Sequence, residues 1–340
     1  MGGVTTITDV AREAGVSKTT VSYVISRNPR IPEATANRVR EAMNRLGYTV
    51  NYAARALSTA KTMTIGLLIN EADGLSVSLT RGAYLCKLSD YARAQGYDLL
   101  LMNNRNGVSA IRDVVSARKV DGLILMDVLR EDPRVAAARE TGIPTVLLGV
   151  PSDSCGLDQV DTDFGRAAHE LVDLFARQGH REVAVVHTAE VPEETGANYA
   201  VRFRQALLEE TADKGLVLDV PPADEWDLDP GEKLRAVLTR FPRATGVIVD
   251  DDNSVISAPQ VLMELGVAVP RDLSVAVVAP DVVRTTMRIP YTAIDINLPA
   301  VAERTVETLM RRIADPSGPA VTQLVSQPLT DLGSVAAVQA

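Results

Sequence analysis

Hydrophobic and polar positions follow two different patterns along this chain, and the pattern changes near residue 62. Before residue 47, apolar residues recur every three to four positions, which is the spacing of amphipathic helices. After residue 62, short apolar runs of strand length alternate with longer amphipathic segments. The chain therefore predicts a small helical unit followed by a larger unit of alternating strands and helices.

Two short helices are predicted within the stretch ITDVAREAGVSKTTVSYVIS, which begins at Ile7. Thr6 and Asp9 suit the start of the first helix, and Gly15 suits its end. Ser17 is predicted to cap the second helix, 18–26. Its apolar side carries Val21, Val24 and Ile25, and its polar side carries Lys18, Thr19, Ser22 and Tyr23. A helix-turn-helix that places its second helix in the major groove of DNA has this arrangement. Two amphipathic helices around a glycine turn also occur in all-α domains that never bind DNA.

A third helix is predicted over 33–46, and its apolar side should pack on the first two helices. The Ala-rich segment that follows, 52–58, is too short to be a stable helix by itself. We expect it to need a partner or DNA to stay folded.

The larger unit shows the strand and helix alternation of parallel sheets covered on both faces. Strands are predicted at 63–69, 97–102, 122–126, 145–148, 182–187, 246–249 and 273–279. Helices are predicted near 78–95, 109–118, 133–141, 165–178, 197–213, 230–240 and 255–265. The theme occurs twice, so two lobes with a ligand cleft between them are expected. Segments 292–295, 299–314 and 324–327 should return between the lobes.

Charge and composition narrow the possible functions. The net charge is −9, but residues 1–61 hold nine Lys/Arg against four acids, while the remainder holds 26 against 40. A basic head on an acidic body suits a protein whose head alone is drawn to phosphate. No apolar run is long enough to span a membrane and no secretion signal is present, so we expect a cytoplasmic protein without membrane partners.

The sequence offers few candidates for catalytic or metal-binding chemistry. The two cysteines have no C-x-x-C spacing and are expected to be free thiols. The histidines lack metal-ligand spacing, and there is no nucleophile elbow or phosphate loop. These features predict that the chain is not an enzyme and needs no cofactor or metal. The run Asp250-Asp251-Asp252 could suggest a metal, but a helix N-terminus is the preferred interpretation.

The strings DVAREAGVSKTTVSYVIS, EAMNRLGY and NYAARALST in the head resemble the lactose-repressor (LacI/GalR) family of bacterial regulators. In the body, KVDGLILM, GHREVAVV and ELGVAVPRDLSV resemble the effector domain of the same family. The resemblance implies a helix-turn-helix headpiece with a hinge helix, followed by a two-lobed α/β domain of the periplasmic-binding-protein type. The implied boundaries are 1–49 for the headpiece, 50–61 for the hinge and linker, and 62–340 for effector binding and dimerisation. The N-lobe would span about 62–160 and 293–322, and the C-lobe about 161–292 and 323–340.

Contacts with DNA can be assigned by the position of each side chain on the headpiece. Lys18, Thr19 and Tyr23 project from the exposed side of the second helix and are candidates for base edges. The resemblance implies that Leu57 wedges into the minor groove at the centre of the site, with Ala54 beside it where two hinge helices meet. Leu57 would otherwise be an ordinary linker residue. Phosphate contacts are expected from Ser17, Thr20, Ser22, Ser26, Asn28, Arg30 and Asn51.

Tyr23 departs from the family, which commonly has Arg at this position. Arg reads guanine with two hydrogen bonds, whereas Tyr offers one hydroxyl and a ring. The operator sequence is therefore open at the base that this residue would read.

The resemblance also implies effector contacts in the cleft, at Asp73, Ser76, Asp161, Asp163, Tyr199, Arg202, Trp226, Asp252 and Asp281. Trp226 could instead be a packing residue. Tyr199 stands where the family has a sugar-binding Arg, Asp251 where Asn is usual, and Val278-Ala279-Pro280-Asp281 where Gly-aromatic-Asp-Asp is usual. These departures leave open whether the effector is a plain sugar.

Together these features predict a regulator, most simply a homodimeric repressor that binds double-stranded operator DNA and is controlled by a small molecule. A solute-binding protein would share the body but would lack the head, and residues 1–61 argue against it. An enzyme is the second rival, and no catalytic motif supports it.

Overall fold

The structure is a computed structural model that describes residues 5–25, 30–48, 61–70, 79–103, 106–186, 198–219, 228–326 and 329–338. The chain divides into two compact units, Met1–Thr62 and Met63–Ala340. In the described part of the chain, no helix is long and apolar enough to cross a membrane.

The first unit contains three helices, α1 (Ile7–Ala14), α2 (Lys18–Ile25) and α3 (Glu33–Arg45). The Asp9 carboxylate accepts hydrogen bonds from the backbone and hydroxyl of Thr6, which confirms the predicted start of α1. Gly15 ends α1 with a left-handed φ of 66°, which glycine adopts without strain. Val10, Val21 and Val39, one from each helix, are fully buried against one another. The predicted three-helix core is therefore confirmed.

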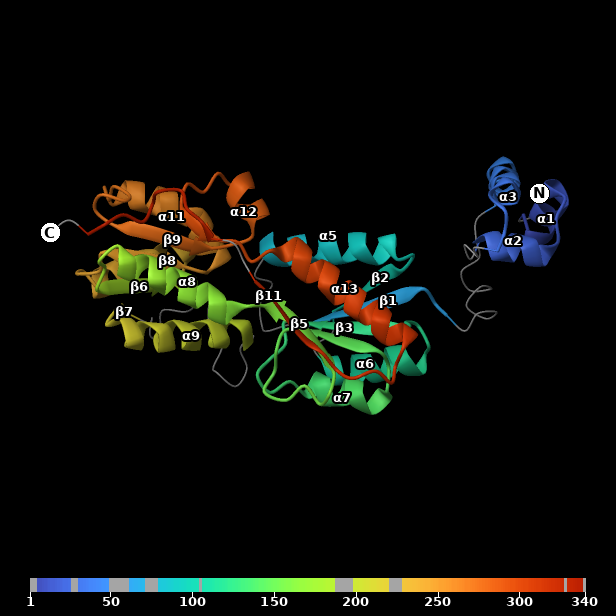
Figure 1. Ribbon diagram of the computed structural model, residues 1–340, viewed down its shortest axis with the longest axis horizontal. Helices are drawn as coiled ribbons and strands as arrows, with labels where there is room; N and C mark the ends of the chain where they lie inside the picture. The colour runs from blue at the N-terminus through green and yellow to red at the C-terminus, as the bar shows by residue number, and fades with distance from the viewer. Residues whose placement is uncertain are drawn as a thin grey trace. The chain divides into compact units, whose positions relative to one another are not determined.

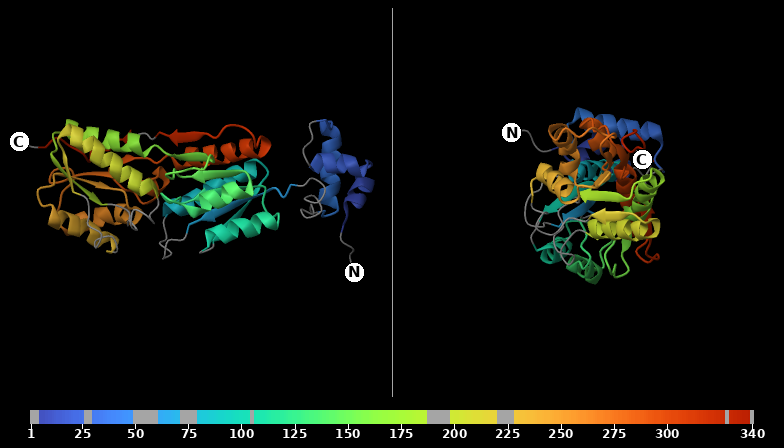
Figure 2. Two further views of the ribbon diagram at one scale, coloured as in Figure 1. Left: turned by 90° about the horizontal axis from the view of Figure 1, so that it is seen from below. Right: turned by 90° about the vertical axis from the view of Figure 1, so that its left-hand side faces the viewer.

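The second unit has two lobes, each built on a six-stranded sheet (Figures 1 and 2). The N-lobe sheet has the order β11-β5-β4-β3-β1-β2, and all of its strands are parallel. Its strands are β1 (Thr64–Ile69), β2 (Asp98–Asn103), β3 (Gly122–Met126), β4 (Thr145–Leu148), β5 (Asp158–Thr162) and β11 (Thr322–Val325). Helices α5 (Leu79–Ala94) and α13 (Leu298–Ala314) cover one face, and α6 (Gly107–Ser116) and α7 (Pro133–Thr141) cover the other (Figure 1).

The burial of β3 explains why its sequence, GLILM, is apolar throughout. Ile124 and Met126 face the layer of α5 and α13, whereas Leu123 and Leu125 face the layer of α6 and α7. Successive side chains of a strand point to opposite faces, and both faces of this sheet are covered.

The C-lobe sheet has the order β12-β10-β9-β8-β6-β7, with only β12 antiparallel. Its strands are β6 (Glu182–Val186), β7 (Val217–Asp219), β8 (Gly246–Val249), β9 (Ser274–Val278), β10 (Thr292–Ile294) and β12 (Leu329–Thr330). The helices are α8 (Phe164–Arg177), α9 (Asn198–Lys214), α10 (Pro230–Arg240), α11 (Asp252–Glu264) and α12 (Asp281–Thr286). Helices α8 and α9 pack on one face, while α10 and α11 pack on the other.

The chain passes between the lobes at different residues from those predicted. The predicted boundaries at 160/161, 292/293 and 322/323 would cut through β5, β10 and β11. A strand belongs as a whole to the sheet with which it pairs, so β5 and β11 lie in the N-lobe and β10 lies in the C-lobe. The three crossings between the lobes therefore follow the ends of β5, β10 and β11 instead of lying within these strands.

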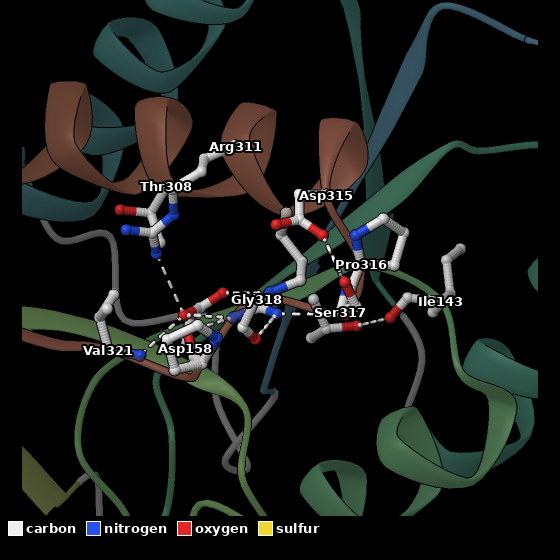
Figure 3. A network of polar contacts seen from close by, with 12 residues as sticks. Ile143, Asp158, Thr308, Arg311, Asp315, Pro316, Ser317, Gly318 and Val321 are labelled. Atoms are coloured by element: carbon white, nitrogen blue, oxygen red, sulfur yellow. Dashed lines mark hydrogen bonds and ion pairs between the residues drawn. The ribbon is translucent and has the colours of Figure 1, made fainter.

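A buried ion-pair network fixes the start of β5, where the fully buried Asp158 lies. Arg312 Nε donates to Asp158 Oδ2 at 2.7 Å, and Arg311 Nη2 lies 3.3 Å from Oδ1. The backbone of Val321 donates to the same Oδ1 at 2.9 Å (Figure 3). Arg312 also donates to the carbonyl oxygens of Pro316 and Pro319. Because the carboxylate is paired and hydrogen-bonded, its burial joins β5, α13 and the segment that leads to β11.

Candidate DNA-contact surface and effector cleft

The second helix of the head exposes one polar face. Val21 and Val24 are buried in the helical core, which leaves Lys18, Thr19, Ser22 and Tyr23 on the outside, with Tyr23 45% exposed. The Tyr23 ring therefore lies on an exposed polar face, outside the buried core of the three helices.

The start of this helix is held locally by the two residues predicted to contact phosphate there. Ser17 Oγ accepts a hydrogen bond from the backbone of Thr20, which confirms the predicted cap, and the two hydroxyls lie 2.9 Å apart. Arg30 is exposed. Ser26, Asn28, Asn51, Ala54 and Leu57, also predicted to contact DNA, lie outside the described residues.

The cleft between the lobes is a cavity of about 190 Å³ within the second unit. It lies at the carboxyl ends of strands from both sheets, where ligands bind in open α/β folds. Phe164 and Tyr199 stack with their ring centroids 5.7 Å apart, and Phe203 lies 5.9 Å from Phe164. The three rings form an apolar part of the cavity lining, whereas its aspartates form a charged part.

Two predicted effector residues are paired with each other in this structure. Arg202 Nη1 lies 2.6 Å from Asp161 Oδ2, and the backbone of Thr162 donates to Asp161 Oδ1 at 2.8 Å. Asp161 is 7% exposed. Burial raises its pKa to about 6, although the charge of Arg202 acts in the opposite direction.

The carboxylate of Asp252 joins the two lobes. Its Oδ1 accepts from the hydroxyl of Thr80 at 2.7 Å, and its Oδ2 accepts from the Thr80 backbone at 3.1 Å. Thr80 lies in the first turn of α5 in the N-lobe, whereas Asp252 begins α11 in the C-lobe. Asp252 therefore satisfies an N-terminal amide of a helix in the other lobe. A second bridge comes from Asn198, whose backbone donates to the carbonyl of Val128 at 2.9 Å.

Asp251 performs the more usual role at the start of its own helix. Its Oδ1 accepts from the backbone of Ser254 at 2.7 Å, and Lys233 Nζ lies 3.5 Å from its Oδ2. This cap agrees with the helix N-terminus predicted for the run of three aspartates. Within the described ranges, no group of three or more His, Cys, Asp or Glu side chains is placed to hold a metal ion.

Asp127, which the sequence reasoning missed, faces the same cavity. It directly follows β3 and has a left-handed φ of 52°. Arg81 Nε lies 3.1 Å from its Oδ2, so the two side chains form an ion pair. Burial raises the pKa of Asp127, against the charges of Arg81 and Arg134. The position after a buried strand in a two-lobed fold was the signal that could have found it.

A buried arginine supports the strained backbone at Asp127. Arg134, 3% exposed, donates to the carbonyl oxygens of Met126 and Asp127 at 3.1 Å each. Its guanidinium also pairs with the Asp132 carboxylate, 2.7 Å away. The Nη2 atom of this guanidinium thus holds the carboxyl end of β3 next to the cavity.

Three predicted effector residues of the described part do not line this cavity, and one of them is Arg202, which reaches it only through its pair with Asp161. Asp163 caps α8 by accepting from the backbone of Arg166 at 3.1 Å, and Asp281 pairs with Arg284 at the start of α12. Both carboxylates therefore act at the start of their own helices in this structure. Asp73, Ser76 and Trp226 lie outside the described residues.

A headpiece of three helices, joined to a two-lobed sheet protein with an interlobe cavity, defines the class of ligand-responsive DNA-binding regulators. Family models agree: residues 6–51 match "Bacterial regulatory proteins, lacI family", and residues 172–335 match "Periplasmic binding protein-like domain". The chain belongs to the LacI family and is a DNA-binding transcriptional regulator.

Curated relatives extend over most of the chain. Catabolite control protein A of Priestia megaterium is 30% identical over 281 residues, which are 79% of this chain and 81% of the relative. The HTH-type transcriptional repressor PurR of Vibrio atlanticus is 26% identical over 317 residues, 91% and 92% of the two chains. These relatives are transcription regulators rather than enzymes.

Solved structures show the same fold. The lac repressor dimer bound to operator and the anti-inducer ONPF is 19% identical, with a TM-score of 0.75 and coverage of 98% of this chain and 100% of that chain. The transcriptional regulator CelR in complex with cellobiose is 22% identical, with a TM-score of 0.67 and coverage of 97% and 99%. The predicted fold class is therefore confirmed.

Proposed function

We propose that this chain is a cytoplasmic repressor that binds a near-palindromic operator as a homodimer and is controlled by a small molecule in the interlobe cavity. The observation that carries the DNA part is the exposed polar face of α2 on a well-packed helical core. The relative named PurR is a repressor, and the lac repressor structure is a dimer on its operator, which supports the same assembly here. A two-fold protein reads a two-fold site.

In this proposal, the headpiece separates base reading from positioning. Lys18, Thr19 and Tyr23 read base edges in the major groove, and Leu57 with Ala54 opens the minor groove at the centre of the site. Phosphate contacts come from Ser17, Thr20, Ser22, Ser26, Asn28, Arg30 and Asn51.

The effector part rests on the contacts that join the lobes. Asp252 and Asn198 bridge the N-lobe and C-lobe at the edge of the cavity, so a ligand that competes with these contacts changes lobe closure. Lobe closure and DNA binding are then coupled through one conformational equilibrium, so the small molecule changes the affinity for DNA and DNA changes the affinity for the small molecule. Tyr199, Arg202, Asp161 and Asp252 are the proposed effector contacts in the described part, with Asp73, Ser76, Asp163, Trp226 and Asp281 as further candidates.

A gel-shift titration with DNA from neighbouring promoters tests the DNA part. We expect a discrete complex at low salt whose affinity falls steeply as salt rises, because phosphate contacts release counterions. The matched comparison is Lys18→Ala against Lys119→Ala, since Lys119 is an exposed lysine of the second unit. Loss of DNA binding in Lys18→Ala, with DNA binding unchanged in Lys119→Ala, supports the proposal. A folded protein that gives no shift at low salt rejects it.

A further inference from the structure

The second unit begins with a non-glycine residue in a left-handed backbone conformation. The boundary between the two units falls between Thr62 and Met63, and β1 starts one residue later, at Thr64. Met63 has a φ of 54°, a region that residues with a side chain adopt only at a cost in free energy. Because a strand needs an extended backbone, the left-handed residue turns the chain away from the line of β1 at this point.

Hydrogen bonds on both sides hold Met63 in this conformation. Its backbone amide donates to Oδ2 of Asp121 at 2.9 Å, and its carbonyl accepts from the backbone of Asp98 at 2.9 Å. Asp98 begins β2 and Asp121 directly precedes β3, and these two strands flank β1 in the sheet. The backbone of Asp121 also donates to the carbonyl of Thr64 at 2.8 Å. The first residue of the second unit is thus bonded to the starts of both neighbouring strands.

The Asp121 carboxylate is the part of this arrangement that acts through a side chain. The other two hydrogen bonds join backbone groups and follow from the pairing of the parallel strands. A carboxylate that accepts from a backbone amide makes a charge-assisted bond, which is stronger than a neutral one. A strained conformation persists only where its surroundings hold it. Without this acceptor, Met63 can return to the extended region that its side chain prefers.

The position of Met63 in the chain gives its conformation a consequence for DNA binding. Four residues, 59–62, separate it from the hinge helix predicted at 52–58, and such a stretch spans at most roughly 14 Å. When two linked heads bind one duplex, the effective concentration of the second head depends on the length and stiffness of the connection. A stiff connection raises that concentration at one half-site spacing and lowers it at other spacings.

We propose that Asp121 is a positioning residue for operator binding. Through the amide of Met63, it fixes the direction in which the linker leaves the second unit, and so sets the half-site spacing that the two heads of a dimer accept. The inference rests on the proposed function in taking the chain to bind its operator as a dimer.

Two pairs of variants separate the proposed role from other effects. Asp121→Ala removes the acceptor, whereas Asp121→Asn removes the charge but keeps an oxygen that can accept from the Met63 amide. Met63→Thr introduces a β-branched residue, which disfavours the left-handed region, whereas Met63→Asn introduces a residue of similar size that tolerates it. The first variant of each pair should loosen the connection, and the second should keep most of it.

Gel-shift titrations of the full chain on DNA with altered spacing measure the effect. The probe is the duplex that the wild-type chain selects from genomic DNA, with zero, one or two base pairs inserted at its centre of symmetry. Each insertion separates the half-sites by roughly 3.4 Å and rotates them by roughly 34°. We expect two insertions to raise the Kd of the wild type about 100-fold. The same insertions should raise the Kd of Asp121→Ala and Met63→Thr only about tenfold, and both should bind the original duplex about tenfold more weakly.

The spacing penalty distinguishes positioning from a general structural role. A residue that only stabilises the second unit would lower its stability in urea and leave the insertion penalty unchanged, and that result in Asp121→Ala and Met63→Thr overturns the proposal. An equal loss of the penalty in Asp121→Asn assigns the effect to charge and also overturns it. Met63→Thr decides the question if Asp121→Ala does not fold.

Failure of this inference and failure of the proposed function give different results. A folded wild-type chain that forms no complex with DNA at low salt rejects the proposed function, and the positioning role is rejected with it. Wild-type binding with an unchanged insertion penalty in both loosened variants rejects the positioning role alone.

Discussion

The hydrogen bonds between Asp252 and Thr80 are predicted to be a latch that keeps the lobes closed. Asp252→Ala removes a carboxylate that accepts two hydrogen bonds from Thr80, at 2.7 and 3.1 Å. Thr80→Val removes only the hydroxyl bond and preserves the shape of the side chain. Comparison of the two variants therefore separates the contribution of the bond from the Thr80 backbone from that of the bond from its hydroxyl.

The size of the effect follows from the kinds of bond involved. Loss of a side chain that satisfies an N-terminal helix amide costs about 1 kcal/mol, and a hydrogen bond to a charged acceptor contributes about 1.5–3 kcal/mol. We expect Asp252→Ala to cost about 2–3 kcal/mol and Thr80→Val about 1–2 kcal/mol. The double variant should cost less than the sum by about 1 kcal/mol, because both changes remove the same hydroxyl bond.

Denaturant unfolding of the four proteins gives the energies, and small-angle scattering gives the lobe separation. A destabilisation of the closed form by about 2 kcal/mol shifts an open–closed equilibrium about 30-fold, so Asp252→Ala should have the larger radius of gyration. Asp98→Ala is a matched control, because this exposed aspartate lies at the far end of β2. Additive energies within about 0.3 kcal/mol, together with unchanged scattering, would refute the latch.

Three further predictions concern the core, the cleft and the headpiece. Gly246→Ala should destabilise the C-lobe by about 1–3 kcal/mol in urea unfolding, because a Cβ there would lie 2.4 Å from Phe175. Gly82→Ala on α5 is the control, since a Cβ there meets nothing within 4 Å and the change should be neutral or stabilising. Equal changes in unfolding free energy for the two variants would contradict the packing argument. The pKa of Asp161 is raised in the folded protein to about 6, so its contribution to stability is present at low pH and is lost by up to ~3 kcal/mol as pH rises from ~4 through 6. Asp161→Asn should flatten that part of the unfolding profile, and an unchanged slope would exclude Asp161 as its source. Tyr23→Arg should change the preferred base at one symmetric pair of operator positions in a site-selection experiment, and the same motif from both proteins would remove Tyr23 from base reading.

The head and most strands were predictable because local signals and tertiary packing agree there. Thr6, Asp9, Gly15 and Ser17 act at the helix ends where their chemistry predicts. Strand β3 is an apolar run because both of its faces are covered.

Strand β5, DQVDT, was not predicted, since its polar sequence is typical of a loop. Its burial depends on Arg311 and Arg312 at one end and on Arg202 at the other, all distant in sequence. Only the folded chain brings these partners together.

The residues that line the cleft were predictable only in part. Asp161, Tyr199 and Asp252 were found through the family resemblance, and all three line the cavity. Asp163 and Asp281 were assigned the same role, but in this structure they act at the starts of α8 and α12. A sequence pattern does not distinguish a carboxylate that only caps a helix, such as Asp163, from one that lines the cavity, such as Asp252, because both stand where a strand is followed by a helix.

Selection of bound fragments from sheared genomic DNA by the full chain, followed by footprinting, tests the central claim most directly. The account predicts one enriched motif with two-fold symmetry whose two halves are both protected from cleavage in the footprint. The central base step, where Leu57 would enter the minor groove, should be cleaved more readily than its neighbours. Fragments that share no symmetric motif, or that random DNA displaces equally well, would contradict the account of this chain as an operator-binding regulator.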